Sequence, residues 1–449
     1  MELYPHQKEA LELTKEFNRC AYYLDMGLGK TYIGSEKMIS LNTYGNLVIC
    51  QKSKVDDWIN HFKENYQDKM FLQIYDLTDK KQLLKFINDV QEAEKPNEIY
   101  DDWTEQTYCE PSLDPFTYVG VINYDLVFRR KELLNLRNFT MLLDESSIIQ
   151  NDKAKRTKFI LKMKPENVVL LSGTPSAGKY ENLWTQIHLL GWNISKDLYN
   201  KQYINWNRLD VGGVPIWVVD KEEPYKNVER LKDKLRIHGA IFKKTEECFD
   251  LPEQIFIPIY TKTPKEYMKF KKDGIVEIEG DVLVGDSNLT KRIYARQLCG
   301  KYNSYRYEAF EDLLESTSDR IIVFYNFIEE KEKLKKLILE HQRSVSEVNG
   351  QIKDLSNYEE HDDSVTLVQY QSGSRGLNLQ KANKIVYFSL TETSDLFEQS
   401  KKRIHRIGQS ETCFYYIMLC KNTIEDKGIL PTLEKRKDFD DELFREEIW

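Results

Sequence analysis

The residues of this chain with the clearest chemical potential begin with a glycine-rich turn near the N-terminus. Residues 26–31 read MGLGKT and follow the apolar run AYYLD at 21–25. Glycines let successive backbone N–H groups face phosphate oxygens, and a helix N-terminus adds partial positive charge. Lys30 is therefore suited to neutralise the β- and γ-phosphates of ATP, and Thr31 to ligate Mg²⁺. Leu24 replaces the first glycine of the strict phosphate-loop pattern, and a plain helix cap is the structural alternative.

Two acids follow another apolar run, at the point where a buried strand is expected to end. Residues 141–143 (MLL) lead directly into Asp144 and Glu145. Ligand sites in parallel sheets form at the carboxyl ends of the strands. Asp144 is suited to hold Mg²⁺, and Glu145 to orient and deprotonate an attacking water. A helix N-cap with acids in its first turn is the alternative interpretation of such a pair.

Polar turns follow two further apolar runs. Residues 170–175 (LLSGTP) end in a small hydroxyl-rich turn, which suits a sensor between the γ-phosphate and a nucleic-acid groove. As an isolated pattern, SGTP indicates only a tight turn. Residues 369–379 (QYQSGSRGLNL) offer backbone amides and small hydroxyls, which grip a phosphodiester without reading its sequence. Ordinary loop chemistry is the alternative for this second segment.

Two arginines near the C-terminus are suited to complete a phosphoryl-transfer site. Arg403 and Arg406 stand three positions apart within residues 399–409 (QSKKRIHRIGQ), so a helix would put them on one face. In phosphoryl transfer, an arginine that enters the site late can stabilise the negative charge on the equatorial oxygens of the transferred group. Such an arginine raises the rate by a factor on the order of 10³ to 10⁵. If these arginines come from a second lobe, hydrolysis requires the lobes to close. A solvated basic helix is the alternative.

The elements that must position these residues are short apolar, β-branched runs of the kind found in buried parallel strands. The runs lie at residues 46–50, 118–122, 141–143, 168–171, 321–324, 365–368 and 384–388. Segments with helical spacing, such as 56–66 and 329–341, separate them. Alternation of strand and helix predicts the α/β class with parallel sheets.

The strand-like runs form two groups, and a long segment of different character separates them. Two lobes are therefore expected in a chain of 449 residues, at residues 1–240 and 241–449. Residues 191–240 are rich in Trp, Tyr, Asn and charge, which predicts an accessory protrusion rather than a sheet. A polar insert at residues 78–115 is expected at the surface of the first lobe.

Composition narrows the class of protein. The chain is 41% hydrophobic and 31% charged, as in ordinary globular proteins. Its net charge of -8 excludes a protein that coats nucleic acid through overall positive charge, so any such contact needs a local basic groove. No window approaches the run of about 18 apolar residues that a membrane span needs, and no signal peptide is evident, so we expect a cytoplasmic protein of a bacterium or of a host cell. The 7 cysteines form no C-x-x-C pair, so reduced thiols are expected.

Taken in order, these segments resemble the motifs of superfamily-two helicases, and specifically the Swi/Snf branch of double-stranded DNA translocases. The matching segments are residues 4–7 (YPHQ, the glutamine motif), 25–31 (motif I), 47–50 with Trp58 (Ia), 121–124 (Ib), 144–147 (II), 171–175 with 181–184 (III), 322–327 (IV), 376–379 (V), 403–409 (VI) and 423–425 (the element after motif VI). RIHRIGQ at 403–409 is the most branch-specific of them. The chain lacks recognisable reader domains, so it looks like the compact versions found in bacteria and phages.

The resemblance implies a fold and a set of contacts. The implied fold is two RecA-like parallel-sheet lobes in tandem with a helical protrusion between them. The implied catalytic residues are Lys30, Asp144, Glu145, Arg403 and Arg406. The implied nucleotide contacts are Gln7, Gly27, Leu28, Gly29, Lys30, Thr31 and Gln409, with Gln7 at the adenine, and Thr31 and Asp144 at Mg²⁺. The implied DNA contacts are Ser53, Lys54, Asn123, Thr174, Ser372, Arg375 and Asn378.

Three residues depart from the family pattern. Ser147 stands where many relatives have histidine, so the link from the nucleotide to motif III is expected to use a smaller hydroxyl. Arg375 replaces a small apolar residue in motif V, which adds a candidate phosphate contact. Gln51 replaces a proline in motif Ia. None of these changes removes a group that carries the chemistry.

The expected function is that of a monomeric, ATP- and Mg²⁺-dependent DNA translocase that moves along duplex or branched DNA. A strand-separating helicase of replication or recombination is the alternative within the enzymes, and the insert at residues 78–115 has room for the wedge hairpin that strand separation needs. An ATP-gated clamp that binds DNA and turns over slowly is the alternative from another class. Sequence-specific recognition is not expected, because phosphate-tracking loops carry no base information.

Overall fold

The computed structural model describes residues 3–25, 27–68, 70–95, 97–101, 106–110, 115–176, 179–211, 214–220, 222–373 and 377–435. The chain divides into two compact units, Met1–Cys248 and Phe249–Trp449. Unit 1 extends past residue 240, where the sequence placed the domain boundary, because β11 (Ala240–Lys243) pairs with β1 (Arg19–Leu24).

Unit 1 is built on a seven-stranded sheet in the order β11-β1-β8-β7-β2-β6-β3, and every pair in it is parallel. Its remaining strands are β2 (Gly45–Cys50), β3 (Leu72–Asp76), β6 (Thr117–Asn123), β7 (Thr140–Asp144) and β8 (Asn167–Ser172). All residues of β2 and β8 are buried, as continuous apolar runs in a parallel sheet require. The expected strands of the first lobe are therefore confirmed.

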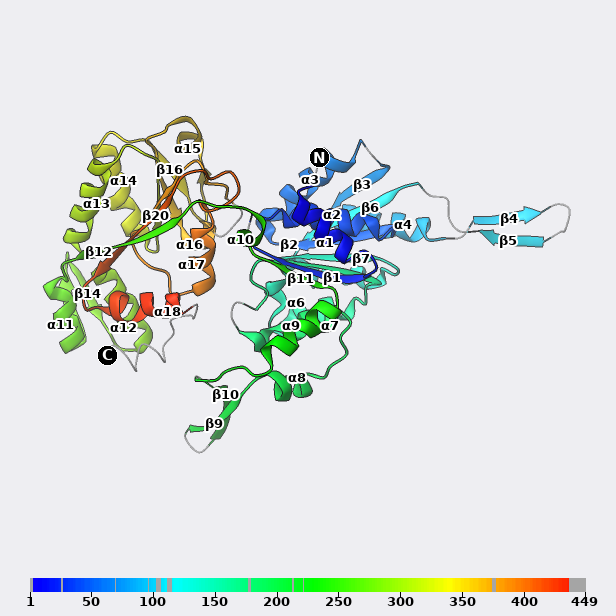
Figure 1. The fold of residues 1–449 in the computed structure, drawn as a ribbon, viewed down its shortest axis with the longest axis horizontal. Coiled ribbons are helices and arrows are strands. Elements are labelled where there is room, and N and C mark those ends of the chain that lie inside the picture. The colour runs from blue at the N-terminus through cyan, green and yellow to red at the C-terminus, as the bar shows by residue number, and fades with distance from the viewer. Residues whose placement is uncertain are drawn as a thin grey trace. The chain divides into compact units, whose positions relative to one another are not determined.

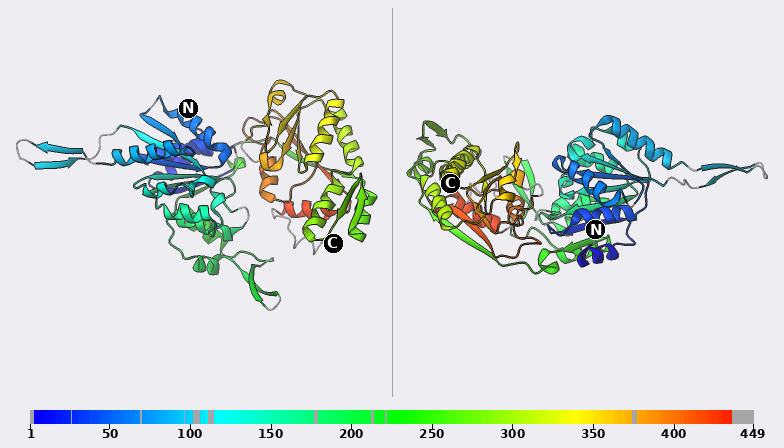
Figure 2. Two further views of the ribbon diagram at one scale, coloured as in Figure 1. Left: turned by 180° about the vertical axis from the view of Figure 1, so that it is seen from behind. Right: turned by 90° about the horizontal axis from the view of Figure 1, so that it is seen from above.

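Helices cover both faces of this sheet (Figures 1 and 2). The helices of unit 1 are α1 (Pro5–Leu13), α2 (Lys30–Ser40), α3 (Val55–Tyr66), α4 (Lys80–Ala93), α5 (Tyr124–Val127), α6 (Lys155–Lys162), α7 (Trp184–Leu189), α8 (Lys196–Tyr203), α9 (Val228–Ile237) and α10 (Thr245–Cys248). A Cβ on Gly34 of α2 would lie 2.7 Å from Leu171 and 3.1 Å from Leu142, so α2 packs directly on that face. Met141 and Leu170 point to the other face, in one core cluster with α6 and α7.

The two accessory segments of unit 1 differ from their prediction in part. The insert at residues 78–115 was expected at the surface, yet α4 packs Leu83, Phe86 and Val90 into the core, because apolar residues recur at helical spacing within a polar sequence. The rest of the insert contains the antiparallel strands β4 (Asn97–Asp101) and β5 (Gln106–Glu110). The protrusion at 191–240 contains α8 and α9, as expected, and also an unexpected hairpin of β9 (Trp206–Val211) and β10 (Val214–Val219).

Unit 2 is built on a second seven-stranded sheet, in the order β12-β20-β19-β15-β18-β16-β17. The strands are β12 (Gln254–Thr261), β15 (Ile321–Tyr325), β16 (Val345–Val348), β17 (Lys353–Asp354), β18 (Val365–Gln369), β19 (Lys384–Tyr387) and β20 (Cys413–Cys420). Only the β16–β17 pair is antiparallel among the described pairs of this sheet. The predicted class of two RecA-like parallel-sheet units in tandem is thus confirmed.

Helices also cover both faces of the second sheet (Figure 1). They are α11 (Lys265–Asp273), α12 (Asn288–Cys299), α13 (Ser304–Ser316), α14 (Ile328–Glu340), α15 (Ser356–Glu360), α16 (Tyr370–Gly373), α17 (Ser394–Lys401) and α18 (Leu430–Glu434), with a small hairpin of β13 (Ile275–Ile278) and β14 (Asp281–Val284). One core cluster joins α13 and α14 to the sheet, and another joins α11, α12 and α17 to it. In the part of the chain that the structure describes, no helix is long and apolar enough to cross a bilayer.

Helix α3 packs on α2 through a buried polar contact. His61 Nε2 lies 2.8 Å from Ser35 Oγ, and Ser35 Oγ lies 2.8 Å from Tyr66 OH. The His61 side chain is 8% exposed, and burial lowers its pKa to about 4. His61 is therefore neutral at physiological pH and holds α3 against the helix that begins at the glycine-rich turn.

This burial predicts a loss of stability in mild acid. An unfolded histidine has a pKa of about 6.5, so as the pH falls below that value the unfolded chain takes up a proton before the native one does. At pH 5 the cost at His61 is about 2 kcal/mol of unfolding free energy. Urea unfolding of His61→Gln should therefore show a smaller loss between pH 7 and pH 5 than the wild type shows. The exposed His361→Gln is the matched control and should behave as wild type; an equal loss in all three proteins would contradict the prediction.

Candidate functional site

The polar segments of unit 1 meet at one edge of its sheet. Strands β1, β8, β7, β2 and β6 are neighbours in that order and run parallel, so their carboxyl ends lie on the same side. The glycine-rich turn follows β1, Thr174 follows β8, Asp144 ends β7, Ser53 follows β2, and Asn123 ends β6. Ligand sites of open parallel sheets form at this edge.

The glycine-rich turn has the geometry of a phosphate loop. Gly27 has φ 88° and Gly29 has φ 71°, a region that favours glycine. Gly29 caps α2, so the N-terminal amides of an 11-residue helix open towards the loop. Lys30 Nζ donates to Leu24 O at 2.9 Å and to Asp25 O at 3.2 Å, which folds the ammonium group over the loop.

Gln7 contacts this loop directly. Its Nε2 donates to Leu28 O at 3.3 Å, and its Oε1 accepts from Tyr4 N at 2.8 Å. A Cβ on Gly29 would come within 2.2 Å of Gln7 Nε2, so glycine is required here by close approach as well as by backbone conformation. The structure therefore brings Gln7 to the loop, and its contact with adenine stays a prediction.

Asp144 receives a side-chain hydrogen bond, and its pKa is shifted by its surroundings. Trp58 Nε1 of α3 donates to Asp144 Oδ2 at 2.9 Å, and Tyr124 OH donates to the Asp144 backbone carbonyl at 2.9 Å. Desolvation raises the pKa of Asp144, and the Trp58 hydrogen bond and the charges of Lys30 and Lys54 oppose that rise. The phosphate-loop lysine and the acid of motif II are thus close enough for their charges to interact.

Glu145 has an unusual backbone. Its φ of 53° and ψ of 58° lie in the left-handed region, which costs a residue with a side chain of the order of 1–3 kcal/mol. The short helix Ser146–Ile149 follows at once, and Ile148 N donates to Glu145 O at 2.9 Å. A strained backbone conformation persists only where the surrounding structure enforces it, and such conformations cluster at functional sites.

The residues at this edge fit ATP and Mg²⁺. The glycine-rich turn precedes the N-terminal amides of α2, which suit phosphate oxygens, and Lys30 beside it carries the positive charge that phosphate needs. Carboxylate and hydroxyl oxygens are the ligands that Mg²⁺ prefers, and Asp144 and Thr31 supply them. Among the described residues another possible metal cluster is Cys299, Cys420 and Glu425, but Glu425 is ion-paired with Arg306 there.

Arg403 and Arg406 converge within unit 2 although they are not on a helix. Helix α17 ends at Lys401, so the helical arrangement considered from the sequence does not form. Arg403 Nη1 donates to Leu377 O at 3.2 Å, and Arg406 Nη1 donates to the same oxygen at 3.3 Å. Burial lowers the pKa of Arg406 from its usual value of 12.5, which leaves it charged at neutral pH.

Gln409 locks the same two segments together. Its Nε2 donates to Ala382 O at 2.9 Å and to Gln380 O at 3.2 Å. Gln409 is 9% exposed, so in unit 2 it holds residues 403–409 against residues 377–382. Its predicted contact with the nucleotide stays a prediction.

The predicted DNA contacts lie in different environments. Ser53 and Asn378 are exposed, Thr174 is half-buried, and Lys54 Nζ pairs with Asp57 at 2.7 Å. Asn123 is 2% exposed, and its Oδ1 has no hydrogen-bond partner within the described structure. Arg375 and the side chain of Ser372 lie outside the described residues.

Sequence reasoning missed how motif II is linked to motif III. The sequence indicated Ser147 for this link, but Ser146 makes it: Ser146 Oγ donates to Gln186 Oε1 at 2.7 Å, and Gln186 Nε2 donates to Pro175 O at 2.7 Å. Gln186 was not a candidate, because it lies in α7, outside the motif segments, and its partners are distant in sequence. The Trp58 contact with Asp144 was missed for the same reason.

Two family models match consecutive parts of the chain, and the first of them extends beyond the end of unit 1. The family model described as SNF2-related domain matches residues 6–300, and the one described as helicase conserved C-terminal domain matches residues 305–408. An uncharacterised ATP-dependent helicase of Mycoplasma genitalium is 24% identical over 64% of this chain and 29% of its own length. Another from Bacillus subtilis is 24% identical over 96% of this chain and 78% of its own.

Other relatives are larger or more distant. A putative ATP-dependent helicase/translocase of Bacillus subtilis is 23% identical over 71% of this chain, which spans only 37% of that protein. The chain thus spans less than two fifths of the length of two of these relatives. The solved SWI2/SNF2 ATPase core of Sulfolobus solfataricus in complex with dsDNA matches 95% of this chain and 89% of its own, with a TM-score of 0.42 and 17% identity.

The Trp58 contact leads to a prediction about stability. A hydrogen bond to a charged acceptor contributes about 1.5–3 kcal/mol, so Trp58→Phe should lower the unfolding free energy by about 2 kcal/mol beyond the loss of packing. The same change in an Asp144→Ala background should cost less, because the acceptor is already gone. Chemical unfolding of the four proteins measures the coupling. Equal costs in both backgrounds would show that Trp58 acts by packing alone.

Proposed function

Because this chain belongs to the SNF2-related family, the Swi/Snf-like branch of the superfamily-two helicases, we propose that it tracks along duplex DNA. Members of this family are nucleic-acid-dependent ATPases. The observation that carries the proposal is the meeting of Lys30, Asp144 and Glu145 at one sheet edge with the predicted DNA contacts of unit 1. A nucleotide and a nucleic acid bound along one edge would share the same strand ends, so hydrolysis can be linked to movement.

The chemical roles follow from the geometry of unit 1. Lys30, freed from its two carbonyl partners, neutralises the β- and γ-phosphates, which the amides at the start of α2 also hold. Glu145 orients and deprotonates the attacking water. Asp144 and Thr31 would hold Mg²⁺, which when bound neutralises charge on the phosphates. Trp58 keeps one oxygen of Asp144 occupied, so the carboxylate has a fixed orientation.

The arginines of unit 2 complete the proposed reaction. Arg403 and Arg406 stabilise charge on the transferred phosphoryl group when the two units close over ATP. Both are held by one carbonyl, Leu377 O, so they can act as a single rigid pair. Closure that depends on ATP, followed by opening after hydrolysis, converts the chemical step into displacement.

Tracking without sequence preference is supported by the kinds of residue among the predicted DNA contacts. Ser53 and Thr174 of unit 1 and Asn378 of unit 2 have small polar side chains, which suit phosphate and sugar contacts. The net charge of -8 leaves overall attraction to DNA weak, so binding depends on these local contacts. Salt should therefore weaken DNA binding through the few phosphates that are contacted.

One observation favours strand separation as the second candidate. The insert at residues 78–115 contains the β4–β5 hairpin, and an element of this kind is what a wedge at a fork requires. A slow ATP-gated clamp remains the alternative from a different class, and Glu145→Gln decides it: a clamp would keep its biological activity without hydrolysis.

The proposed function predicts a rank order of ATPase stimulation. Linear duplex DNA should stimulate ATP turnover more than single-stranded DNA does, and RNA should stimulate least, at one stated salt concentration. Forked and branched DNA belong in the same panel, with strand separation measured on the fork. Equal or greater stimulation by RNA would reject the proposal, and efficient unwinding of the fork would favour the second candidate.

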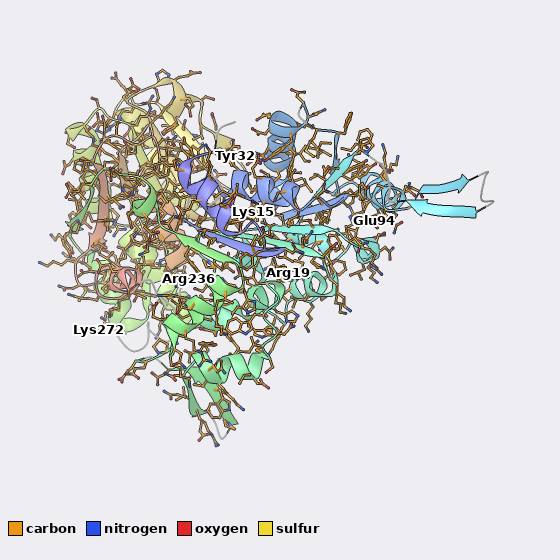
Figure 3. The ribbon with its side chains drawn as sticks, turned by 45° about the vertical axis from the view of Figure 1, so that its right-hand side comes forward. Lys15, Arg19, Tyr32, Glu94, Arg236 and Lys272 are labelled. Carbon is orange, nitrogen blue, oxygen red and sulfur yellow. The ribbon has the colours of Figure 1, made fainter. Side chains whose placement is uncertain are left out.

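Two lysine variants control this experiment. Lys30→Ala should abolish turnover on every nucleic acid while its thermal melting stays that of the wild type. Lys15→Ala removes an exposed lysine, which pairs only loosely with Glu12 at 3.9 Å, and should leave turnover unchanged (Figure 3). Turnover that survives Lys30→Ala would contradict the assigned phosphate site.

A further inference from the structure

Gln186 joins three functional segments of unit 1 through one side chain. It lies in α7 and is 0% exposed. Its Oε1 accepts from Ser146 Oγ at 2.7 Å and from Tyr23 OH at 3.1 Å, and its Nε2 donates to Pro175 O at 2.7 Å. Tyr23 belongs to the strand that leads into the phosphate loop, Ser146 follows Glu145, and Pro175 ends the turn of motif III.

The chemistry of these partners fixes the orientation of the amide. A backbone carbonyl can only accept, so the group that faces Pro175 O must be the NH₂ of Gln186. The amide oxygen then faces Tyr23 and Ser146, whose hydroxyls can both donate. A fully satisfied buried network of this kind is rigid, and each member depends on the others.

The three partners sit at adjacent strand ends. Strands β1, β8 and β7 are neighbours in the sheet, and Tyr23, Pro175 and Ser146 lie at or just beyond their carboxyl ends. A displacement of the motif III turn can therefore reach motif II through the amide of Gln186, which makes the shorter of two contacts with Pro175 O: Gln150 Nε2 donates to the same oxygen at 3.5 Å.

Helix α7 is held in place by bonds that do not involve the amide. Thr185 Oγ1 donates to Ile149 O at 2.8 Å at its start. Arg19, labelled in Figure 3, donates to Leu189 O at 2.8 Å at its end. The helix therefore has its own anchors, and the bonds of Gln186 can be removed without releasing it.

We propose that Gln186 is a positioning residue that couples nucleic acid at the motif III turn to the geometry of Glu145. The inference rests on the proposed function. Nucleic acid that contacts Thr174 shifts Pro175, and Gln186 passes the shift to Ser146. Glu145, directly before Ser146, is in a left-handed conformation, so small changes at Ser146 alter where its carboxylate points. Gln186 thus makes the rate of hydrolysis depend on bound nucleic acid.

Gln186→Glu tests the coupling directly. The carboxylate still accepts from Ser146 and Tyr23, but it cannot donate to Pro175 O, so motif III is disconnected from motif II. The measured quantity is the ratio of the ATPase rate with saturating duplex DNA to the rate without DNA. We expect this ratio to fall at least about fivefold, the lower end of typical coupling between sites. Ser146→Ala removes the other side of the link and should lower the ratio in the same way, with a smaller change in volume.

Thr185→Val is the matched control, because it removes a buried hydrogen bond of the same helix that joins no two motifs. It should keep the wild-type ratio. A wild-type ratio in both Gln186→Glu and Ser146→Ala would overturn the inference, as would an equal fall in Thr185→Val. A wild-type protein whose ATPase no nucleic acid stimulates would overturn the proposed function itself, which is a different result from a stimulated wild type with unaffected variants.

Discussion

The carboxylate of Asp144 is the constraint on which the arrangement of unit 1 depends. A charge withdrawn from water needs donors close by, and here they come from Trp58 and from the nearby positive charge of Lys30. Trp58 can reach Asp144 only if α3 packs beside α2, and the neutral His61 keeps it there through Ser35. The packing of α3 on α2 and the electrostatics of the site therefore depend on each other. A change in either would move Asp144 relative to the phosphate loop.

In unit 2, positively charged arginine side chains are held by nearby acceptors. The buried Arg306 of α13 pairs with Glu425, which ties the segment that follows β20 to α13. Arg403 and Arg406 share Leu377 O, and the next residue, Asn378, is exposed. A nucleic acid that contacts Asn378 would therefore act on the backbone that positions both arginines.

The sequence predicts what depends on local pattern and misses what depends on distant pairs. Buried strands and the turns at their ends follow from apolar runs and from residues such as Gly29 and Asp144, so the fold class and the phosphate loop could be predicted. Helix α4 was missed because its apolar face is diluted by polar residues. The bonds of Gln186, and the meeting of Arg403 and Arg406 at one carbonyl, join positions far apart in the chain. The spacing of apolar residues along the sequence carries no information about such pairs.

We propose that Arg403 and Arg406 of unit 2 act on a triphosphate bound at Lys30, and Arg406→Ala tests this proposal most directly. Single-turnover hydrolysis of ATP in the presence of duplex DNA should slow by a factor on the order of 10³ to 10⁵, while ATP still binds, because the arginine acts mainly on the transition state. Arg236→Ala, which removes an exposed arginine of α9, should hydrolyse ATP as the wild type does (Figure 3). Hydrolysis at the wild-type rate in folded Arg406→Ala would contradict the account.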